Sequence, residues 1–364
     1  MSQPSKKRLR DIGVTIGQLP TGPLNAITDV AGVWVGHETV IADHPNLVRS
    51  GVTMIVPREG QIWSDFAYCG TAILNGNGEM TGIPWMDESG MLGTPIGLTN
   101  THQVGMVRDT LVRHLAAHDL ERSFFLPVVA ETDDSHLNDS DSFPLTEVHA
   151  ATALAKAGPG PVAEGNVGGG TGMICHEFKG GIGTSSRVVE ISGEVITVGV
   201  LVQANYGIRE DLRIDGFPVG RHLGFDVIPS AWDGEDQRES DGSIIVVIAT
   251  DAPLLADQCR RLARRATVGL ARAGGYGHDS SGDIFVAFAT GNHLPVGEKI
   301  HTVRTLHHDQ MTPLMRATAD ATEESILNAL CAAETMTGFG GRTAYELPLP
   351  RVESLLSEWF DPPR

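Results

Sequence analysis

The chain has 364 residues, of which 41% are hydrophobic and 20% charged, a composition typical of a folded globular protein. It carries 27 Lys and Arg residues against 45 Asp and Glu, a formal charge of −18. Phosphates of nucleic acids and anionic membrane surfaces repel such an acidic chain, so neither is expected as a partner. Small molecules or peptides are expected instead, and the length allows two domains or one large layered domain.

The cysteines and the amino terminus indicate a soluble, cytoplasmic protein. Cys69, Cys175, Cys259 and Cys331 are far apart in the sequence, which predicts buried free thiols rather than a disulfide framework. The first residues lack the apolar stretch of a secretory signal, and no uncharged apolar run approaches the length of a membrane span.

Apolar segments between glycines and prolines predict strands in the first hundred residues, over 33–35, 51–56, 71–74 and 94–99. Apolar residues at three- and four-residue spacing predict a helix over 103–118. A strand over 124–130, a helix over 145–157 and strands over 187–191 and 194–203 are expected to follow. Strands and helices thus mix throughout, as in an α/β protein.

The second half contains a change in composition. Residues 208–242 are rich in Asp, Glu, Arg, Gly and Pro, which predicts a long exposed connection with a linking or functional role. The run Ser-Ile-Ile-Val-Val-Ile-Ala-Thr at 243–250 predicts a buried strand. A helix over 254–273, a strand over 283–290 and a helix over 323–333 complete the expected elements.

Several patterns resemble known chemical sites without meeting their requirements. The glycine-rich segment 165–172 lacks a following Gly-Lys-Ser/Thr and a preceding strand, so close backbone packing is favoured over a phosphate loop. His278, Asp279 and Ser281 include triad residue types, but catalytic triads assemble from distant positions, so a surface loop is expected. Among 14 histidines none lies in an HExxH arrangement, and no metal site is expected.

The segment Asp241-Gly242-Ser243 joins the polar connection to the buried strand. Such a segment is usually a turn. It also suits self-cleavage, because a serine hydroxyl can attack the preceding carbonyl carbon, and glycine leaves that carbonyl open. Hydrolysis of the resulting ester frees an amino-terminal serine, whose α-amine has a pKa near 8 and can act as the base for its own hydroxyl.

Nearly the whole chain resembles the L-aminopeptidase/D-esterase and β-peptidyl aminopeptidase family, whose members cut themselves before a serine and use it as an amino-terminal nucleophile. Six segments carry the resemblance in the same order: 22–33, 74–79, 95–102, 165–187, 200–207 and 241–253. The resemblance implies a four-layer α-β-β-α sandwich, cleaved between Gly242 and Ser243 into a large fragment, 1–242, and a small fragment, 243–364. It also implies a homo-oligomer, a tetramer or an octamer, and no cofactor.

Residue by residue, the resemblance assigns Ser243 as nucleophile and base. Asn205, in Gln-Ala-Asn-Tyr-Gly, matches an asparagine near the oxyanion, where an amide would stabilise negative charge. Ser281 and Asp283 match a serine and an acidic residue that orient the nucleophile and its amine. Without the resemblance, Asn205 is expected to be a turn residue, and Ser281 and Asp283 to belong to a polar loop.

Glu131 matches a glutamate that pairs with the ammonium group of the substrate, for which a carboxylate is the natural partner. The alternative is an exposed glutamate at the end of a strand. Asp133 departs from the pattern, since close relatives carry an aromatic residue there. Additional acid near Glu131 would favour cationic or small amine-bearing substrates.

The function expected from this resemblance is a self-processing aminopeptidase, amidase or esterase. It would release amino-terminal residues from short peptides, amides or esters that carry a free amino group, through an acyl-enzyme on Ser243. One alternative is acyl transfer from the same acyl-enzyme to an amine. Another is an uncleaved, non-catalytic protein whose glycine-rich loop binds an anion.

Overall fold

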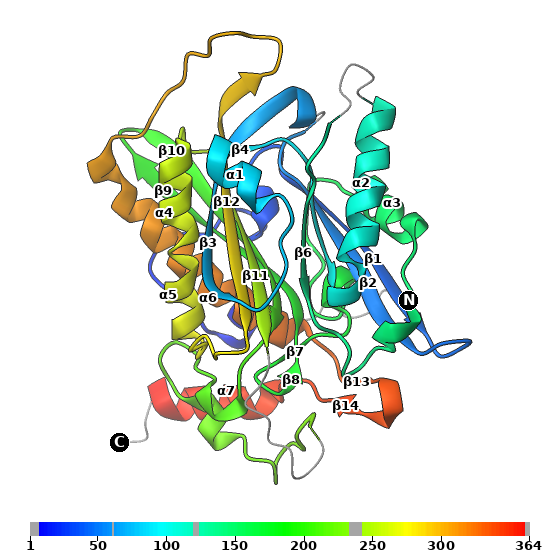
Figure 1. Cartoon of the computed structure of the whole chain (residues 1–364). Helices are drawn as coiled ribbons and strands as arrows, with labels where there is room; N and C mark the ends of the chain where they lie inside the picture. Colours follow the sequence, from blue (N-terminus) through cyan, green and yellow to red (C-terminus); the bar gives the residue numbers. More distant parts are fainter. Residues whose placement is uncertain (1–6, 60–61, 119–123, 233–241, 361–364) are drawn as a thin grey trace.

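The chain folds into two β-sheets with helices outside them, as seen in a computed structural model (Figure 1) that describes residues 7–59, 62–118, 124–232 and 242–360. The α-helices are α1 (Ile83–Ser89), α2 (Val104–His118), α3 (Glu147–Ala155), α4 (Ala256–Ala263), α5 (Ala266–Arg272), α6 (Met311–Ala332) and α7 (Leu349–Phe360). The longer strands are β1 (Trp34–Ala42), β2 (Val48–Val56), β3 (Asp65–Gly76), β5 (Ile96–Asn100), β6 (Val128–Thr132), β9 (Gly181–Ile191), β10 (Glu194–Asn205), β11 (Ser243–Thr250) and β12 (Gly282–Pro295). The two-residue strands are β4 (Met91–Leu92), β7 (Ile174–Cys175), β8 (Phe178–Lys179), β13 (Met336–Thr337) and β14 (Thr343–Ala344).

One sheet has four strands in the order β1-β2-β5-β6, and the other has six in the order β4-β3-β12-β11-β10-β9. Most neighbours run antiparallel, but β5 and β6 are parallel, and so are β11 and β12. The parallel pair β11–β12 lies near the middle of the larger sheet. The start of β11 therefore lies between the end of β10 and the start of β12.

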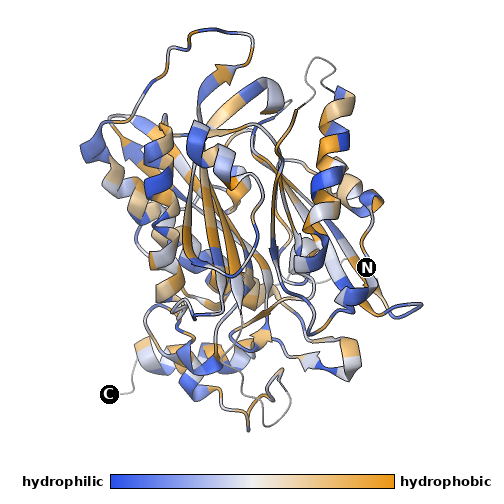
Figure 2. Ribbon diagram, viewed as in Figure 1, coloured by the Kyte–Doolittle hydropathy of each residue, from blue (hydrophilic) through white to orange (hydrophobic). Residues whose placement is uncertain are grey.

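The inner faces of the two sheets pack against each other. Ile96, Leu98 and Ala130 of the smaller sheet share a buried apolar cluster with Ile245 and Val247 of the larger one. Alternate residues of β11, such as Ile244 and Val246, point to the opposite face and pack under the helices. Because both faces of the larger sheet are covered, its central strands are apolar on both sides, as Figure 2 shows.

Helices cover the outer face of each sheet. α2 and α3 pack on the four-stranded sheet, where Val107, Leu111 and Ala150 meet Val52 and Met54. α4, α5 and α6 lie on the outer side of the six-stranded sheet (Figure 1). The α-β-β-α order of layers that the resemblance implies is therefore confirmed.

Most predicted elements are confirmed, some with longer bounds. The strand expected over 243–250 is β11, with every residue buried, and the helix expected over 103–118 is α2. All four cysteines are free and buried, as expected. In the described part of the chain, no helix combines the length and the apolar character needed to cross a membrane.

Three predictions need correction. The connection over 208–242 is only partly exposed where it is described, because residues 208–232 bury Leu212, Ile214 and Phe217 in the main core. The Arg209 guanidinium holds this segment by donating to the carbonyls of Ile228 and Pro229, 2.5 and 3.0 Å away. Residues 233–241, including Asp241, lie outside the described residues.

The helix predicted over 254–273 is instead two helices, α4 and α5. They separate where the Arg265 amide bonds to the Leu262 carbonyl, three residues back, rather than four. The helix predicted over 323–333 is the second half of α6, which begins at Met311.

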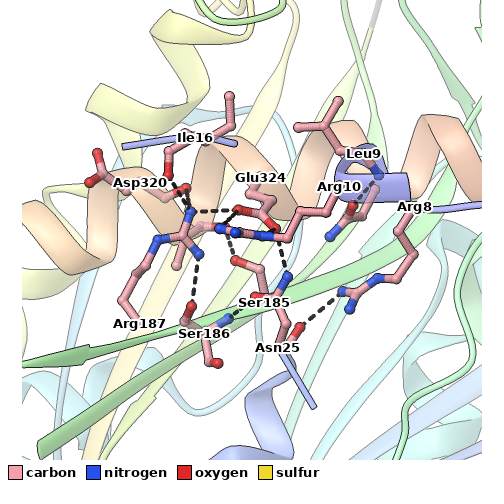
Figure 3. Close-up of polar contacts among 12 residues, drawn as sticks. Arg8, Leu9, Arg10, Ile16, Asn25, Ser185, Ser186, Arg187, Asp320 and Glu324 are labelled. Atoms are coloured by element: carbon pink, nitrogen blue, oxygen red, sulfur yellow. Dashed lines mark hydrogen bonds and ion pairs between the residues drawn. The ribbon is translucent and has the colours of Figure 1, made fainter. Parts of the chain in front are cut away.

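A buried ion-pair network joins α6 to the larger sheet and to the amino-terminal segment (Figure 3). Glu324 of α6 accepts from Arg187 of β9 at 2.6 Å, and neither side chain is exposed. Arg10 donates to both Glu324 carboxylate oxygens, at 2.7 and 2.9 Å, and Asn25 donates to one at 2.6 Å. Burial raises the pKa of Glu324, but the hydrogen bond from Arg10 and the charge of Arg187 outweigh it, so the net pKa is lowered. Glu324 therefore accepts hydrogen bonds from three side chains that precede β11 in the sequence, those of Arg10, Asn25 and Arg187.

Candidate active site

Ser243, Asn205 and Gly282 lie side by side at one end of the six-stranded sheet. Ser243 is the first residue of β11 and lies opposite Asn205, the last residue of β10, and opposite Gly282, the first residue of β12. The β-branched run that follows Ser243 fixes it at the strand end, because all of β11 is buried. Ser243 and Asn205 are each 8% exposed.

The Gly282 amide contacts both groups that a self-cleavage reaction would involve. Its N–H donates to the Gly242 carbonyl oxygen at 3.0 Å and to Ser243 Oγ at 3.3 Å. Gly242 itself is tightly packed, since a Cβ there would lie 2.7 Å from Tyr206 Cα. The chain thus approaches Ser243 through a site that only glycine fits without displacing Tyr206.

The orientation of the Asn205 amide is set by two hydrogen bonds. Its Oδ1 accepts from the Ile174 amide at 2.7 Å, and its Nδ2 donates to the Asp133 carbonyl at 2.9 Å. An NH₂ group has two donors, so the second N–H of Asn205 is available for a ligand. Asn205 is therefore a held donor beside Ser243 and not a turn residue exposed to solvent.

Ser281 and Asp283 form a buried hydrogen-bonded pair next to Gly282. Ser281 Oγ donates to Asp283 Oδ1 at 2.7 Å, and Asn75 Nδ2 donates to Asp283 Oδ2 at 3.2 Å. Burial raises the pKa of Asp283, and the hydrogen bonds from Ser281 and Asn75 oppose that rise. Both side chains are buried, so the polar surface loop expected at Ser281 is wrong for this residue.

Glu131 is the next-to-last residue of β6 in the smaller sheet and is only 3% exposed, which does not fit an exposed strand-end glutamate. Its Oε1 accepts from the Glu79 amide at 2.8 Å, and its Oε2 accepts from the Thr101 hydroxyl. Burial raises the pKa of Glu131 against these two hydrogen bonds, and the charges of Asp133 and Glu79 raise it further. The site thus holds a buried carboxylate without a cationic side chain among the described partners.

A short segment between the sheets connects Glu131 with Ser243. A Cβ at Gly78 would lie 3.2 Å from Glu131 Oε1 and 3.2 Å from Gly282 Cα. Asn77 fixes this segment, since its Nδ2 donates to the Ser280 carbonyl at 2.6 Å. The structure therefore brings Glu131 and Ser243 to the same region from different sheets, with Gly78 and Gly282 between them.

Asp133 lies beside this region, and its carboxylate is hydrogen-bonded to Ser135. Its two oxygens accept from the Ser135 amide at 2.9 Å and from the Ser135 hydroxyl at 2.8 Å, and the side chain is exposed. Its backbone carbonyl is the acceptor for Asn205. Asp133 therefore contributes a backbone contact and a nearby negative charge.

The glycine-rich segment packs closely, as predicted. A Cβ at Gly169 would lie 2.1 Å from Gln203 Oε1, and one at Gly170 would lie 2.4 Å from the Ile182 amide. The Gly168 and Gly169 amides already donate to the hydroxyls of Thr39 and Thr53. These contacts favour backbone packing over an anion site.

Sequence reasoning assigned no role to Asn75, Thr101, Gly78 or Gly282. Asn75 and Gly78 lie in the segment 74–79 and Thr101 in 95–102, both of which carry the family resemblance. Their contacts with Asp283 and Glu131 join residues far apart in the chain. The only signal in the sequence that could have identified them as site residues is that they lie in those segments.

Comparison with known proteins agrees with this site. The family model described as peptidase family S58 matches residues 25–344. The beta-peptidyl aminopeptidase BapA of Sphingosinicella microcystinivorans is 46% identical over 367 residues, covering 97% of this chain and 92% of that protein.

Two solved structures match in fold. A beta-aminopeptidase from Burkholderia sp. has a TM-score of 0.90 and 47% identity, covering 98% of this chain and 100% of that one. The L-aminopeptidase D-Ala-esterase/amidase of Ochrobactrum anthropi, described as a variant of the Ntn hydrolase fold, has a TM-score of 0.89 and 42% identity, covering 97% and 99%. The chain belongs to peptidase family S58 and is an aminopeptidase with this variant of the Ntn hydrolase fold.

Proposed function

We propose that the chain cleaves itself between Gly242 and Ser243 and then uses Ser243 to release amino-terminal residues from short peptides, amides or esters. The observation that carries this proposal is the Gly282 amide, which contacts both the Gly242 carbonyl oxygen and Ser243 Oγ. The hydroxyl and the carbonyl that must react are thus held by one donor. That donor would also stabilise negative charge on the carbonyl oxygen.

Self-cleavage begins when Ser243 Oγ loses its proton and bonds to the Gly242 carbonyl carbon. The Gly242–Ser243 amide bond then breaks as its nitrogen takes up a proton, leaving an ester between the two residues. Water hydrolyses the ester, which gives Gly242 a carboxyl group and Ser243 a free hydroxyl and α-amine. The fragments are 1–242 and 243–364.

In the cleaved protein the Ser243 α-amine takes the hydroxyl proton as Oγ attacks the substrate carbonyl. The second N–H of Asn205 and the Gly282 amide donate to the oxyanion. The leaving group takes the proton, and water hydrolyses the acyl-enzyme. Ser281 and Asp283 orient the serine and its amine.

Glu131 binds the substrate ammonium. A buried carboxylate without a cationic partner suits this role, because an ammonium group supplies the missing charge. The exposed carboxylate of Asp133 adds negative potential near Glu131 and favours cationic or small amine-bearing substrates. Homo-oligomeric assembly and a cytoplasmic location stay predictions from the sequence.

The experiment that tests the nucleophile compares wild type with Ser243→Ala in the hydrolysis of an alanyl p-nitroanilide. We expect kcat to fall by about 10³-fold or more, because covalent catalysis and its base are lost together. Ser357→Ala, on the exposed side of α7, should leave activity unchanged. Activity of Ser243→Ala near the wild-type level would refute the assignment.

The packing of Gly242 makes a second prediction. Gly242→Ala places a Cβ 2.7 Å from Tyr206 Cα and displaces the Gly242 carbonyl from the Gly282 amide, so self-cleavage should slow severalfold. The cleaved fraction is measured over time by denaturing gel electrophoresis. Gly105→Ala is the control, since a Cβ at Gly105 meets nothing within 4 Å. If Gly242→Ala cleaved itself at the wild-type rate, the close packing of Gly242 against Tyr206 would not be needed for self-cleavage.

A third prediction concerns pH. The Thr101 hydroxyl lowers the pKa of Glu131 by stabilising its ionised form, so Thr101→Val should raise that pKa further. Ammonium binding needs the carboxylate, so the acid limb of the kcat/KM profile should move to higher pH. Thr312→Val, an exposed residue of α6, is the control. An unmoved limb, or one moved to lower pH, would contradict the role of Glu131.

A further inference from the structure

A cavity lies on the helical side of the six-stranded sheet and shares no lining residue with the site around Ser243. It has a volume of about 480 Å³. It is formed by the amino-terminal segment 16–18, the loop at 213–216, the end of α5 and the middle of α6. Its charged lining residues are Arg213, Asp215, Arg272, Arg316, Asp320 and Glu323.

Two of these carboxylates are buried but are not equally well paired. Asp320 and Glu323 are each 3% exposed. Arg272 Nη1 hydrogen-bonds to Asp320 Oδ1 at 2.6 Å and forms a longer ion pair with Glu323 Oε2 at 3.6 Å. Burial raises the pKa of Glu323 to about 7 against the opposing charge of Arg272, and the charges of Asp215 and Asp320 raise it further. Glu323 thus lines the cavity as a buried carboxylate that shares Arg272 with Asp320 and has the longer of the two ion pairs.

The same cavity offers guanidinium groups for an anion. Arg213 and Arg316 line it, and neither forms a salt bridge with another side chain of the described part of the chain. Within that part, no group of three acidic, histidine or cysteine side chains is arranged to hold a metal ion. The chemistry therefore favours an organic ligand with both an ammonium and a carboxylate group.

We propose that this cavity binds a free amino acid, with its ammonium on Glu323 and its carboxylate on Arg213 and Arg316. A zwitterion supplies both a nearer cation for Glu323 and an anion for Arg213 and Arg316, whereas a ligand with one charge supplies only one of these. The volume is within the range of small-molecule sites. The cavity also borders the buried network of Figure 3, since Ile16, which accepts from Arg187 at 2.8 Å, and Asp320 belong to both.

The test measures binding of L-leucine by isothermal titration calorimetry in Glu131→Gln, where the proposed ammonium site near Ser243 is removed. We expect one binding event that Glu323→Gln weakens at least about tenfold, the usual cost of losing a charged hydrogen bond. Affinity should increase between pH 6 and 8, as Glu323 ionises around its pKa of about 7. Asp226→Asn, an exposed acidic residue outside the cavity lining, is the matched control and should bind as before.

Single-charge analogues test the two halves of the site. Arg316→Ala should weaken leucine and 4-methylpentanoate but leave 3-methylbutylamine unchanged. This variant alters an exposed side chain, so it tests the site even if Glu323→Gln does not fold. No leucine binding at millimolar concentration in Glu131→Gln, or binding unaffected by both Glu323→Gln and Arg316→Ala, would overturn the proposal. Equal leucine binding by wild type and Glu131→Gln would count against Glu131 as a substrate site and still support this one.

Discussion

Replacement of Glu131 by Gln should abolish most of the preference for substrates with a free amino group while leaving self-cleavage intact. The amide keeps the size of the side chain but removes the charge that pairs with the ammonium group. Loss of one partner of a buried charged pair costs about 2–5 kcal/mol, so kcat/KM for an alanyl ester should fall about 30-fold or more. Self-cleavage involves no ammonium group, so fragments 1–242 and 243–364 should still form.

Three comparisons distinguish loss of recognition from general damage. The N-acetylated form of the same ester lacks the ammonium group, and its hydrolysis by Glu131→Gln should stay near the wild-type rate. Glu210→Gln, on an exposed turn, should behave as wild type with both esters. An equal fall for both esters, or no fall for either, would show that Glu131 does not bind the ammonium group.

Replacement of Glu324 by Gln should have the largest effect on stability. It removes the negative charge that faces Arg187, and Arg187 has no exposed side-chain surface through which water could replace that charge. Breaking a buried ion pair by removing one partner costs about 3–5 kcal/mol. The urea midpoint should therefore fall sharply, measured in a Ser243→Ala background so that one uncleaved chain unfolds.

A surface ion pair of the same chemical groups provides the control. Glu194 and Arg304 lie 2.5 Å apart, with 54% and 66% of their side chains exposed. Glu194→Gln should cost at most about 1 kcal/mol, because water screens and replaces the interaction. Similar losses for Glu194→Gln and Glu324→Gln would refute the importance of the buried network.

The pH dependence of the same variant gives an independent check. The pKa of Glu324 is lowered in the folded protein, so its contribution to stability is present above the ordinary pKa of a glutamate. That contribution is lost as the pH falls through the lowered value. The stability difference between the parent and Glu324→Gln should therefore shrink in acid.

The sequence predicts an element well where burial leaves a periodic pattern. β11 is apolar on both faces and gives a continuous run at 243–250, while α2 repeats Val107 and Leu111 on one face. The first half of α6 shows no such pattern, because it buries polar residues such as Thr318 and Asp320. Residues 208–232 look polar, yet Arg209 ties their carbonyls to the core. The structure of the first half of α6 and that of residues 208–232 both depend on tertiary contacts, which the local sequence does not reveal.

The candidate site, too, is predicted by the sequence only in part. The identities of Ser243, Asn205 and Glu131 come from resemblance, but their proximity depends on strand order and register. Nothing local predicts that Gly282 would lie opposite Ser243. The hydrogen bond from Thr101, which opposes the effect of burial on the pKa of Glu131, likewise joins residues far apart in the chain and needs the folded structure.

Self-cleavage is the central claim, and the intact mass of freshly purified protein under denaturing conditions tests it most directly. The account predicts two species in wild type, corresponding to residues 1–242 and 243–364. It predicts a single chain of 38.8 kDa in Ser243→Ala. A wild-type protein that hydrolyses aminoacyl esters while remaining one 38.8 kDa chain would contradict it, because Ser243 would then have no free α-amine.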